Sequence, residues 1–215
     1  MRHSRLLMFL EVTKKDLKLE FKTKSTLCLM LLFGLSCAFL FSYVVGEREL
    51  FLPLILLISI FTGIIGYSIS FLREYDSETI DALKASPLTP QEIVMGKVFF
   101  NLFLMITVQF VLFPICFALF DVDGNFILCF LIFLVGNSSI SLVITSLAPL
   151  SSKSKARELL IPILLFPVIF PNLVLTLKVS KAALAGFVDF VGLAIIAMYT
   201  VLILSISMLV SDHVV

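Results

Sequence analysis

Long apolar runs alternate with short polar segments along the whole chain, and this pattern decides the fold class. Six of the runs are long enough to cross a hydrocarbon layer about 30 Å thick as helices. We expect these spans at residues 26–45, 50–72, 97–120, 126–150, 159–177 and 183–210. The pattern therefore predicts an all-α integral membrane protein with a single transmembrane domain over residues 1–215.

The segment before the first span mixes leucines with lysines. Residues 1–25 combine Leu6, Leu10 and Leu17 with several basic side chains. Such a mixture favours an amphipathic helix in the membrane interface, with its lysines near anionic headgroups. A solvated basic leader is the alternative.

The basic residues are distributed unevenly between the two sides of the predicted bundle. Thirteen of the sixteen Lys and Arg residues lie in segments 1–25, 73–97 and 151–157, which share one side. The turns on the other side hold only Arg48, Lys178 and Lys181. The positive-inside rule therefore predicts that the N- and C-termini are both cytoplasmic.

The most charged interruption, residues 73–88, has the periodicity of a short helix. Glu74, Glu78 and Asp81 recur at i, i+4 and i+7 and share one face. Ser86 precedes Pro87 and should leave the helical region, which ends this helix. The segment therefore predicts a cytoplasmic helix with an acidic face.

A second helix should begin directly after that turn. Thr89 is a good N-cap, Pro90 suits the first helical position, and Glu92 completes a capping box. This helix should continue through Lys97 into the third span. Two helices joined by a sharp turn would transmit force, so we expect the segment to dock on a soluble partner; a solvated loop helix is the alternative.

The predicted docking residues combine the acidic face with an apolar face and the turn. They are Glu74, Tyr75, Asp76, Glu78, Asp81, Leu83, Pro87 and Leu88.

Small residues recur along the second span at intervals of four, three and four. Ser59, Gly63, Gly66 and Ser70 form one face that allows close approach of another helix. Packing within the chain is the simpler interpretation, and an interface between subunits is the other.

Polar residues also lie within the third and fourth spans. Asn101, Gln109 and the series from Asn137 to Ser146 should face other helices or a cavity, because lipid cannot pair with them.

Three prolines, Pro162, Pro167 and Pro171, fall within the fifth span. Each removes a backbone donor, so this helix should be bent or broken. It could gate a path or be shaped only by packing. In a further variant, the stretch from Pro167 to Lys181 dips back into the membrane.

Composition excludes several functions. The chain is 60% hydrophobic and 14% charged with a net charge of +1, so nothing favours nucleic-acid binding. Gly96-Lys97 is followed by Val98, which rules out a phosphate-binding loop for ATP. HExxH and GxSxG motifs are absent, and four isolated cysteines and two distant histidines suggest no metal site. We expect a non-enzymatic protein with no catalytic residue, metal or directly bound cofactor.

The segment from Glu74 to Leu88 resembles the acidic motif between spans 2 and 3 of type-2 ABC exporter membrane subunits. The chain's layout and its Ser-Pro-Leu-Thr-Pro run are most similar to the haem-exporter permeases of cytochrome c maturation, the CcmB family. Glu78 stands where that family usually has Gly, and Asp81 where it usually has Glu.

This resemblance implies a permease dimer in the inner membrane that pairs with two copies of an ABC ATPase subunit. Segment 73–88 would seat on the ATPase, and ATP would bind only there. The complex would work with a haem-handling membrane protein and a haem chaperone, either exporting haem or releasing the loaded chaperone. The alternatives are a type-2 permease for a lipid, glycan or drug, and a membrane scaffold without a transport cycle.

Overall fold

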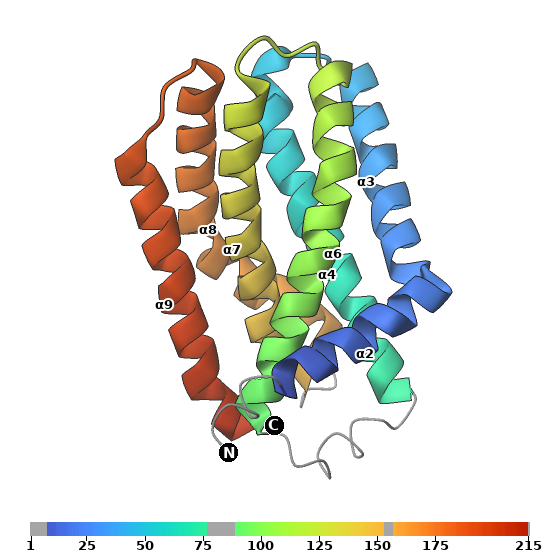
Figure 1. Cartoon of the computed structure of the whole chain (residues 1–215). Helices are drawn as coiled ribbons and strands as arrows, with labels where there is room; N and C mark the ends of the chain where they lie inside the picture. Colours follow the sequence, from blue (N-terminus) through green and yellow to red (C-terminus); the bar gives the residue numbers. More distant parts are fainter. Residues whose placement is uncertain (1–7, 77–88, 153–156, 215) are drawn as a thin grey trace.

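The chain folds into a bundle of long helices that lie roughly side by side, with one shorter helix across its base (Figure 1). The computed structural model describes residues 8–76, 89–152 and 157–214, and side chains at 9–67, 89, 91–146 and 165–209. The helices are α2 (Met8–Thr23), α3 (Ser25–Val44), the 3-10 helix η1 (Arg48–Leu50), α4 (Phe51–Asp76), α6 (Pro90–Leu119), α7 (Phe126–Ser152), α8 (Arg157–Leu184) and α9 (Phe190–Val214). Over these ranges the chain has no strand.

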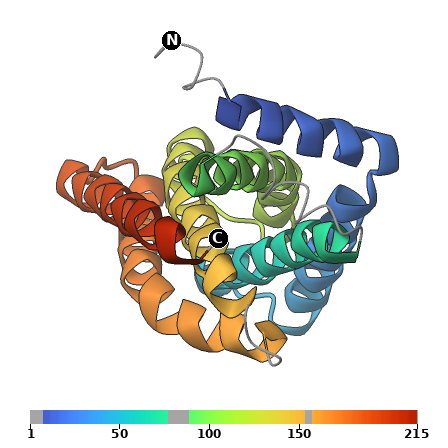
Figure 2. The same cartoon turned by 90° about the horizontal axis from the view of Figure 1, so that it is seen from below.

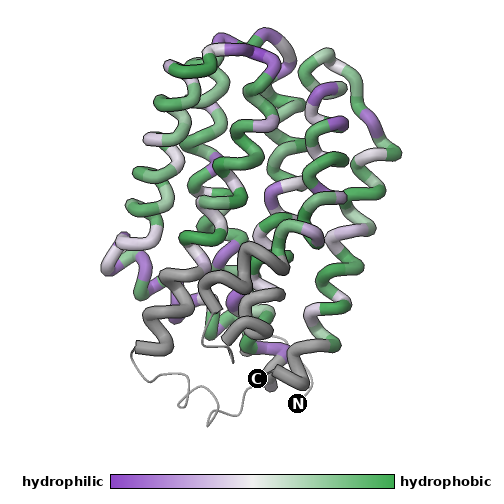
Figure 3. The backbone as a smooth tube through the Cα atoms, turned by 180° about the vertical axis from the view of Figure 1, so that it is seen from behind, coloured by the Kyte–Doolittle hydropathy of each residue, from purple (hydrophilic) through white to green (hydrophobic). Residues whose placement is uncertain are grey.

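Six of these helices are long and apolar enough to cross a membrane, which confirms the predicted fold class. Large apolar side chains remain exposed around the bundle, among them Tyr43 on α3 and Met198 on α9. Apolar residues follow the helices and polar residues gather toward the ends (Figure 3). Such a surface is suited to lipid, because a water-soluble monomer rarely exposes so continuous an apolar area.

Helix α7 is the centre of the bundle. Viewed from below, α4, α6, α8 and α9 surround it (Figure 2). Close approach to α8 depends on Gly136, where an added Cβ would lie 2.4 Å from Thr176 Cγ2. Asn172 on α8 also donates a hydrogen bond to the Gly136 carbonyl at 3.2 Å. A glycine therefore sets the distance between these two helices.

Polar side chains within α6 and α7 pair with each other. Asn101 donates to Thr145 Oγ1 at 3.0 Å, and Asn137 donates to Gln109 Oε1 at 2.6 Å. These contacts confirm the prediction that the polar residues of the third and fourth spans face other helices. They also satisfy part of the hydrogen-bonding capacity that lipid would leave unmet.

The turns between spans form the end of the bundle away from α2. Arg48 pairs with both Asp121 and Asp123, which links η1 to the turn between α6 and α7. Asn125 donates its backbone N–H to the Leu184 carbonyl at 3.1 Å. We call the end of the bundle that these turns form the turn end. The opposite end, where α2 starts, α4 ends and α6 begins, is called the basic end (Figure 1).

The last two spans differ from the expected ranges 159–177 and 183–210. Helix α8 continues past Lys178 and Lys181 to Leu184, and α9 begins only at Phe190. Both lysines are exposed near the turn end, where their long side chains can reach the polar boundary. The expected break is instead at Gly186, whose φ is 85°, before α9 begins. The re-entrant variant is wrong, because residues 167–181 lie within one continuous helix.

The contact at Gly136 gives a prediction for stability. Replacing Gly136 with Ala should destabilise the bundle by about 1–3 kcal/mol, since the new methyl group overlaps Thr176. The double variant Gly136→Ala/Thr176→Ala should recover part of the loss. The thermal unfolding midpoint in detergent measures both effects.

The control for this pair is Ser138→Ala. Ser138 is on the same turn of α7 but bonds only within its own helix, to the Leu134 carbonyl at 2.8 Å. Its replacement should change stability by less than about 0.5 kcal/mol. Equal stability of Gly136→Ala and the unmodified protein would show that the two helices can separate at no cost.

Candidate functional site: the basic end of the bundle

The predicted docking segment joins the end of α4 to the start of α6. Glu74, Tyr75 and Asp76 belong to the last turn of α4, which continues unbroken from the membrane span. The expected span end at residue 72 implied that these residues start a separate helix. They instead continue α4. Glu78, Asp81, Leu83, Pro87 and Leu88 lie outside the described residues. Their docking role stays a prediction.

The start of α6 is fixed by the predicted capping box. Thr89 Oγ1 accepts the Glu92 backbone N–H at 3.3 Å, and Glu92 Oε2 accepts the Thr89 backbone N–H at 2.8 Å. Pro90 occupies the first turn. These two bonds confirm the predicted capping box. Helix α6 therefore begins directly after the docking segment and runs to the turn end.

Helix α2 lies directly against the first turns of α6. Gly96 provides the space, because an added Cβ there would lie 2.7 Å from Val12 Cβ. Thr13 Oγ1 donates to the Gly96 carbonyl at 3.0 Å, and the rings of Phe9 and Phe99 stack 5.3 Å apart. A helix was expected here, but its close packing on α6 was not.

A buried ion pair strengthens this contact. Lys97 Nζ lies 2.8 Å from Asp16 Oδ2, and the two side chains are only 10% and 9% exposed. Lys15 Nζ lies 3.5 Å from the other oxygen of Asp16. Removing one member of a buried pair typically costs about 3–5 kcal/mol, because the remaining charge is left without compensation. Both charges therefore have to be present together.

A second acidic residue of α2 caps the next helix. Glu20 accepts the backbone N–H groups of Thr26 at 2.8 Å and Leu27 at 2.9 Å, and the Thr26 hydroxyl at 2.7 Å. A carboxylate at this position satisfies free N–H groups and complements the helix dipole. The chain turns between the two helices at Lys24, whose φ is 53°.

Sequence reasoning missed both acidic residues. Asp16 and Glu20 are spaced i, i+4 within a run of lysines, and both are buried while Phe21 is 58% exposed. This spacing was the signal available in the sequence. Two carboxylates at i and i+4 repel each other, so their presence on one face of a basic helix indicates that each has a partner. The face of α2 that contacts the bundle is therefore partly polar. A helix that lay only in the membrane interface would be expected to bury an apolar face.

The prolines of α8 do not break the helix. It remains continuous across Pro162, Pro167 and Pro171 and curves around the outside of α7 (Figure 2). Pro167 and Pro171 are exposed, and the Tyr199 hydroxyl on α9 donates to the Val168 carbonyl. The side chain of Pro162 is outside the described part. Whether the bend serves as a gate stays a prediction.

The small residues of the second span contact other helices of the same chain. An added Cβ at Gly63 would lie 2.7 Å from Ile144 Cδ1 on α7, and one at Gly66 would lie 2.6 Å from Met30 Sδ on α3. Ser59 is buried and donates to the Ile55 carbonyl at 2.8 Å. The side chain of Ser70 is not among those described. The three described positions therefore lie at helix contacts inside the bundle.

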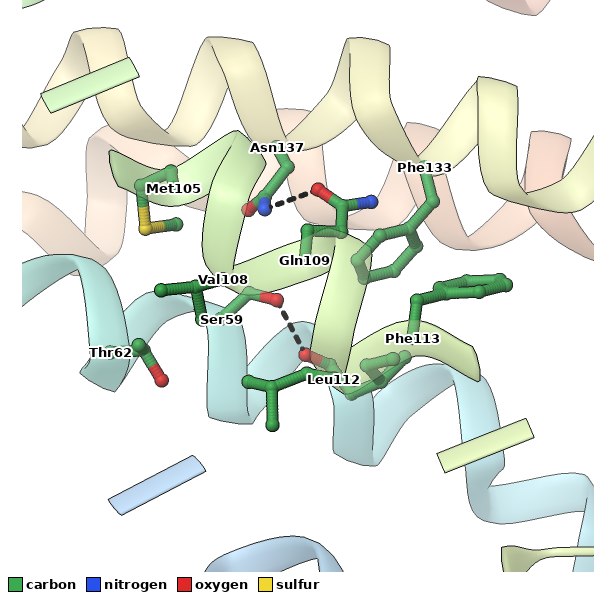
Figure 4. Close-up of a pocket in the computed structure, with 10 residues that line it drawn as sticks. Ser59, Thr62, Met105, Val108, Gln109, Leu112, Phe113, Phe133 and Asn137 are labelled. Atoms are coloured by element: carbon green, nitrogen blue, oxygen red, sulfur yellow. Dashed lines mark hydrogen bonds between the residues drawn. The ribbon is translucent and has the colours of Figure 1, made fainter. Parts of the chain in front are cut away.

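One small cavity lies between α4, α6 and α7. Ser59, Thr62, Gln109 and Asn137 contribute its polar lining, and Phe113 and Phe133 are among its apolar residues (Figure 4). Its volume of about 10 Å³ has room for roughly one water molecule and not for haem. Within the described part of the chain, no three His, Cys, Asp or Glu residues are grouped as metal ligands.

The comparison with protein-family models gives a match over nearly the whole chain. The model of the CcmB protein family matches residues 7–215, nearly the whole chain. No curated protein sequence matches. The family comprises transporter permeases, generally non-catalytic, that are membrane subunits of the haem-export ABC system in cytochrome c maturation, together with an ATPase. With six helices able to cross a membrane and a family match over almost its full length, this multi-pass membrane protein belongs to the CcmB family.

Proposed function

We propose that this chain couples ATP hydrolysis by a separate ATPase subunit to a haem-handling step on the far side of the inner membrane. Segment 73–88 is the contact with the ATPase in this proposal. The observation that carries it is the position of that segment, between the continuous end of α4 and the capped start of α6. Because α4 extends to Asp76 and α6 begins at Pro90, a force applied at either end of the segment acts directly on a membrane helix.

The chemistry of the segment suits a protein partner. Its three spaced acids, Glu74, Glu78 and Asp81, can meet basic residues at the rim of a groove, and apolar Leu83 and Leu88 can enter its centre. We infer one ATPase copy for each permease and a second permease copy to complete a symmetric complex. ATP stays in the ATPase, and this subunit holds no cofactor of its own.

The cargo assignment rests on the family. Cytochrome c maturation requires haem outside the cytoplasm, so the proposed partners are a haem-handling membrane protein and a haem chaperone. The energy of ATP would drive either the export of haem or the release of the loaded chaperone. A lipid, glycan or drug as cargo, or a scaffold with no transport cycle, would give different results in the experiments below.

The docking role is tested by reversing two charges. Glu78→Lys/Asp81→Lys should reduce co-purification of the ATPase with the tagged chain at least tenfold, because like charges would face each other at the rim. The amount of ATPase recovered from native membranes, quantified by mass spectrometry, is the measurement. The matched control is Glu47→Lys/Glu49→Lys, the same charge change at exposed residues of the turn end. Equal recovery with all three proteins would exclude the segment as the docking site.

The cargo is tested by deleting the gene. Loss of this subunit should abolish covalent haem attachment to c-type cytochromes, which haem staining of separated proteins detects. Re-expression of the unmodified chain should restore the stain. Normal c-type cytochromes in the deletion strain, with the ATPase still bound to the chain in wild-type membranes, would support another cargo.

The bend of α8 gives a prediction about transport. Pro171→Ala restores a backbone donor to the helix and leaves no cavity, because the ring is exposed. We expect unchanged or higher thermal stability together with at least threefold slower cytochrome c maturation, if the bend has to move. Pro53→Ala, in the first turn of α4 where proline costs little, is the control. Maturation at the normal rate would show that the bend is only a matter of packing.

A further inference from the structure

Helix α2 connects two membrane helices through two separate buried carboxylates. Asp16 pairs with Lys97 on α6, and Glu20 caps the start of α3. Both carboxylates are on α2, four residues apart, so the two contacts lie one helical turn from each other. A displacement of α6 that acts on Asp16 therefore acts on the cap of α3 as well.

Lys97 is placed to receive movement from the docking segment. It lies seven residues after Pro90, about two helical turns into α6. The intervening residues are helical, and the capping box holds the first turn. A shift at the start of α6 would therefore reach Lys97 as the movement of a rigid rod.

The contact between α6 and α2 is closely packed as well as charged. Thr13 Oγ1 bonds the carbonyl of Gly96, the residue before Lys97, and Val12 fills the space that Gly96 leaves. The pair is shielded from water, so salt screens it less than a surface pair. A contact of this kind holds α2 to α6 as both move.

We propose that α2 is a strap that carries movement of the docking segment from α6 to α3, with Asp16 and Lys97 as its positioning residues. Glu20 is the anchor of the strap on α3. This inference rests on the proposed function, because it requires an ATPase at segment 73–88. It adds a path from α6 to α3 beside their direct contact, through a helix that lies outside the six spans.

The test reverses the ion pair one member at a time in the complex of the full chain with its ATPase. Asp16→Lys and Lys97→Asp should each lower the yield of mature c-type cytochrome per ATP hydrolysed at least tenfold. The double variant Asp16→Lys/Lys97→Asp recreates the pair with opposite polarity and should recover to within about threefold of the unmodified chain. Such recovery indicates direct coupling between the two side chains. ATPase co-purification should be unchanged in all variants.

The chain offers a matched control on the same helix. Glu11 and Lys14 form an ion pair of 3.3 Å, but their side chains are 73% and 69% exposed. Glu11→Lys and Lys14→Glu should leave the yield per ATP unchanged, since exposed pairs contribute little. A loss in these controls equal to that at Asp16 would show that the net charge of α2 matters and the buried pair does not.

A neutral variant separates transmission from folding. Asp16→Asn/Lys97→Met removes both charges together and leaves neither uncompensated, so the protein should keep its thermal midpoint. We expect its yield per ATP to fall at least threefold with the ATPase still bound. An unchanged yield in this folded variant, or a double reversal that folds but does not recover, would overturn the strap. If the unmodified chain does not bind an ATPase, the proposed function itself is wrong.

Discussion

The structure depends above all on the lack of water in the hydrocarbon layer. There, a backbone or side-chain polar group has to find its partner within the protein. The helices satisfy the backbone, and polar side chains at the same depth bond across helix contacts. Asn101 with Thr145 and Asn137 with Gln109 fix the register of α6 on α7 in this way. Asn172, bonded to the Gly136 carbonyl, does the same for α8.

The same constraint explains how much the sequence could predict. An apolar run must be a helix in lipid, so the six spans and the inward direction of Asn101 and Gln109 followed from composition and position. The capping box at Thr89 was predictable because both of its bonds are local. The ends of α8 and α9 were not, because Lys178 and Lys181 resemble a loop in composition, yet they extend from a helix near the boundary.

Contacts between distant segments account for the rest. Nothing near Asp16 in the sequence indicates that Lys97, on another helix, is its partner. Nor does the run of small residues in the second span show whether it meets another helix or another subunit. In the structure Gly63 contacts Ile144 on α7, and Gly66 contacts Met30 on α3. The docking residues from Glu78 to Leu88 lie outside the described part, so their role rests on their pattern and on the family.

The two helices beside the docking segment both contact α3, and α6 also contacts α2, which shapes any movement that enters there. Helix α4 contacts α3 where Gly66 meets Met30. Helix α6 contacts α2 at Gly96 and Lys97, and α2 in turn holds the start of α3 through Glu20. Both routes therefore end on α3, which together with α9 has the smallest buried share of the six candidate spans. A helix with a small buried share loses less packing when it shifts, so forces that enter through α4 and through α6 would both act to displace α3.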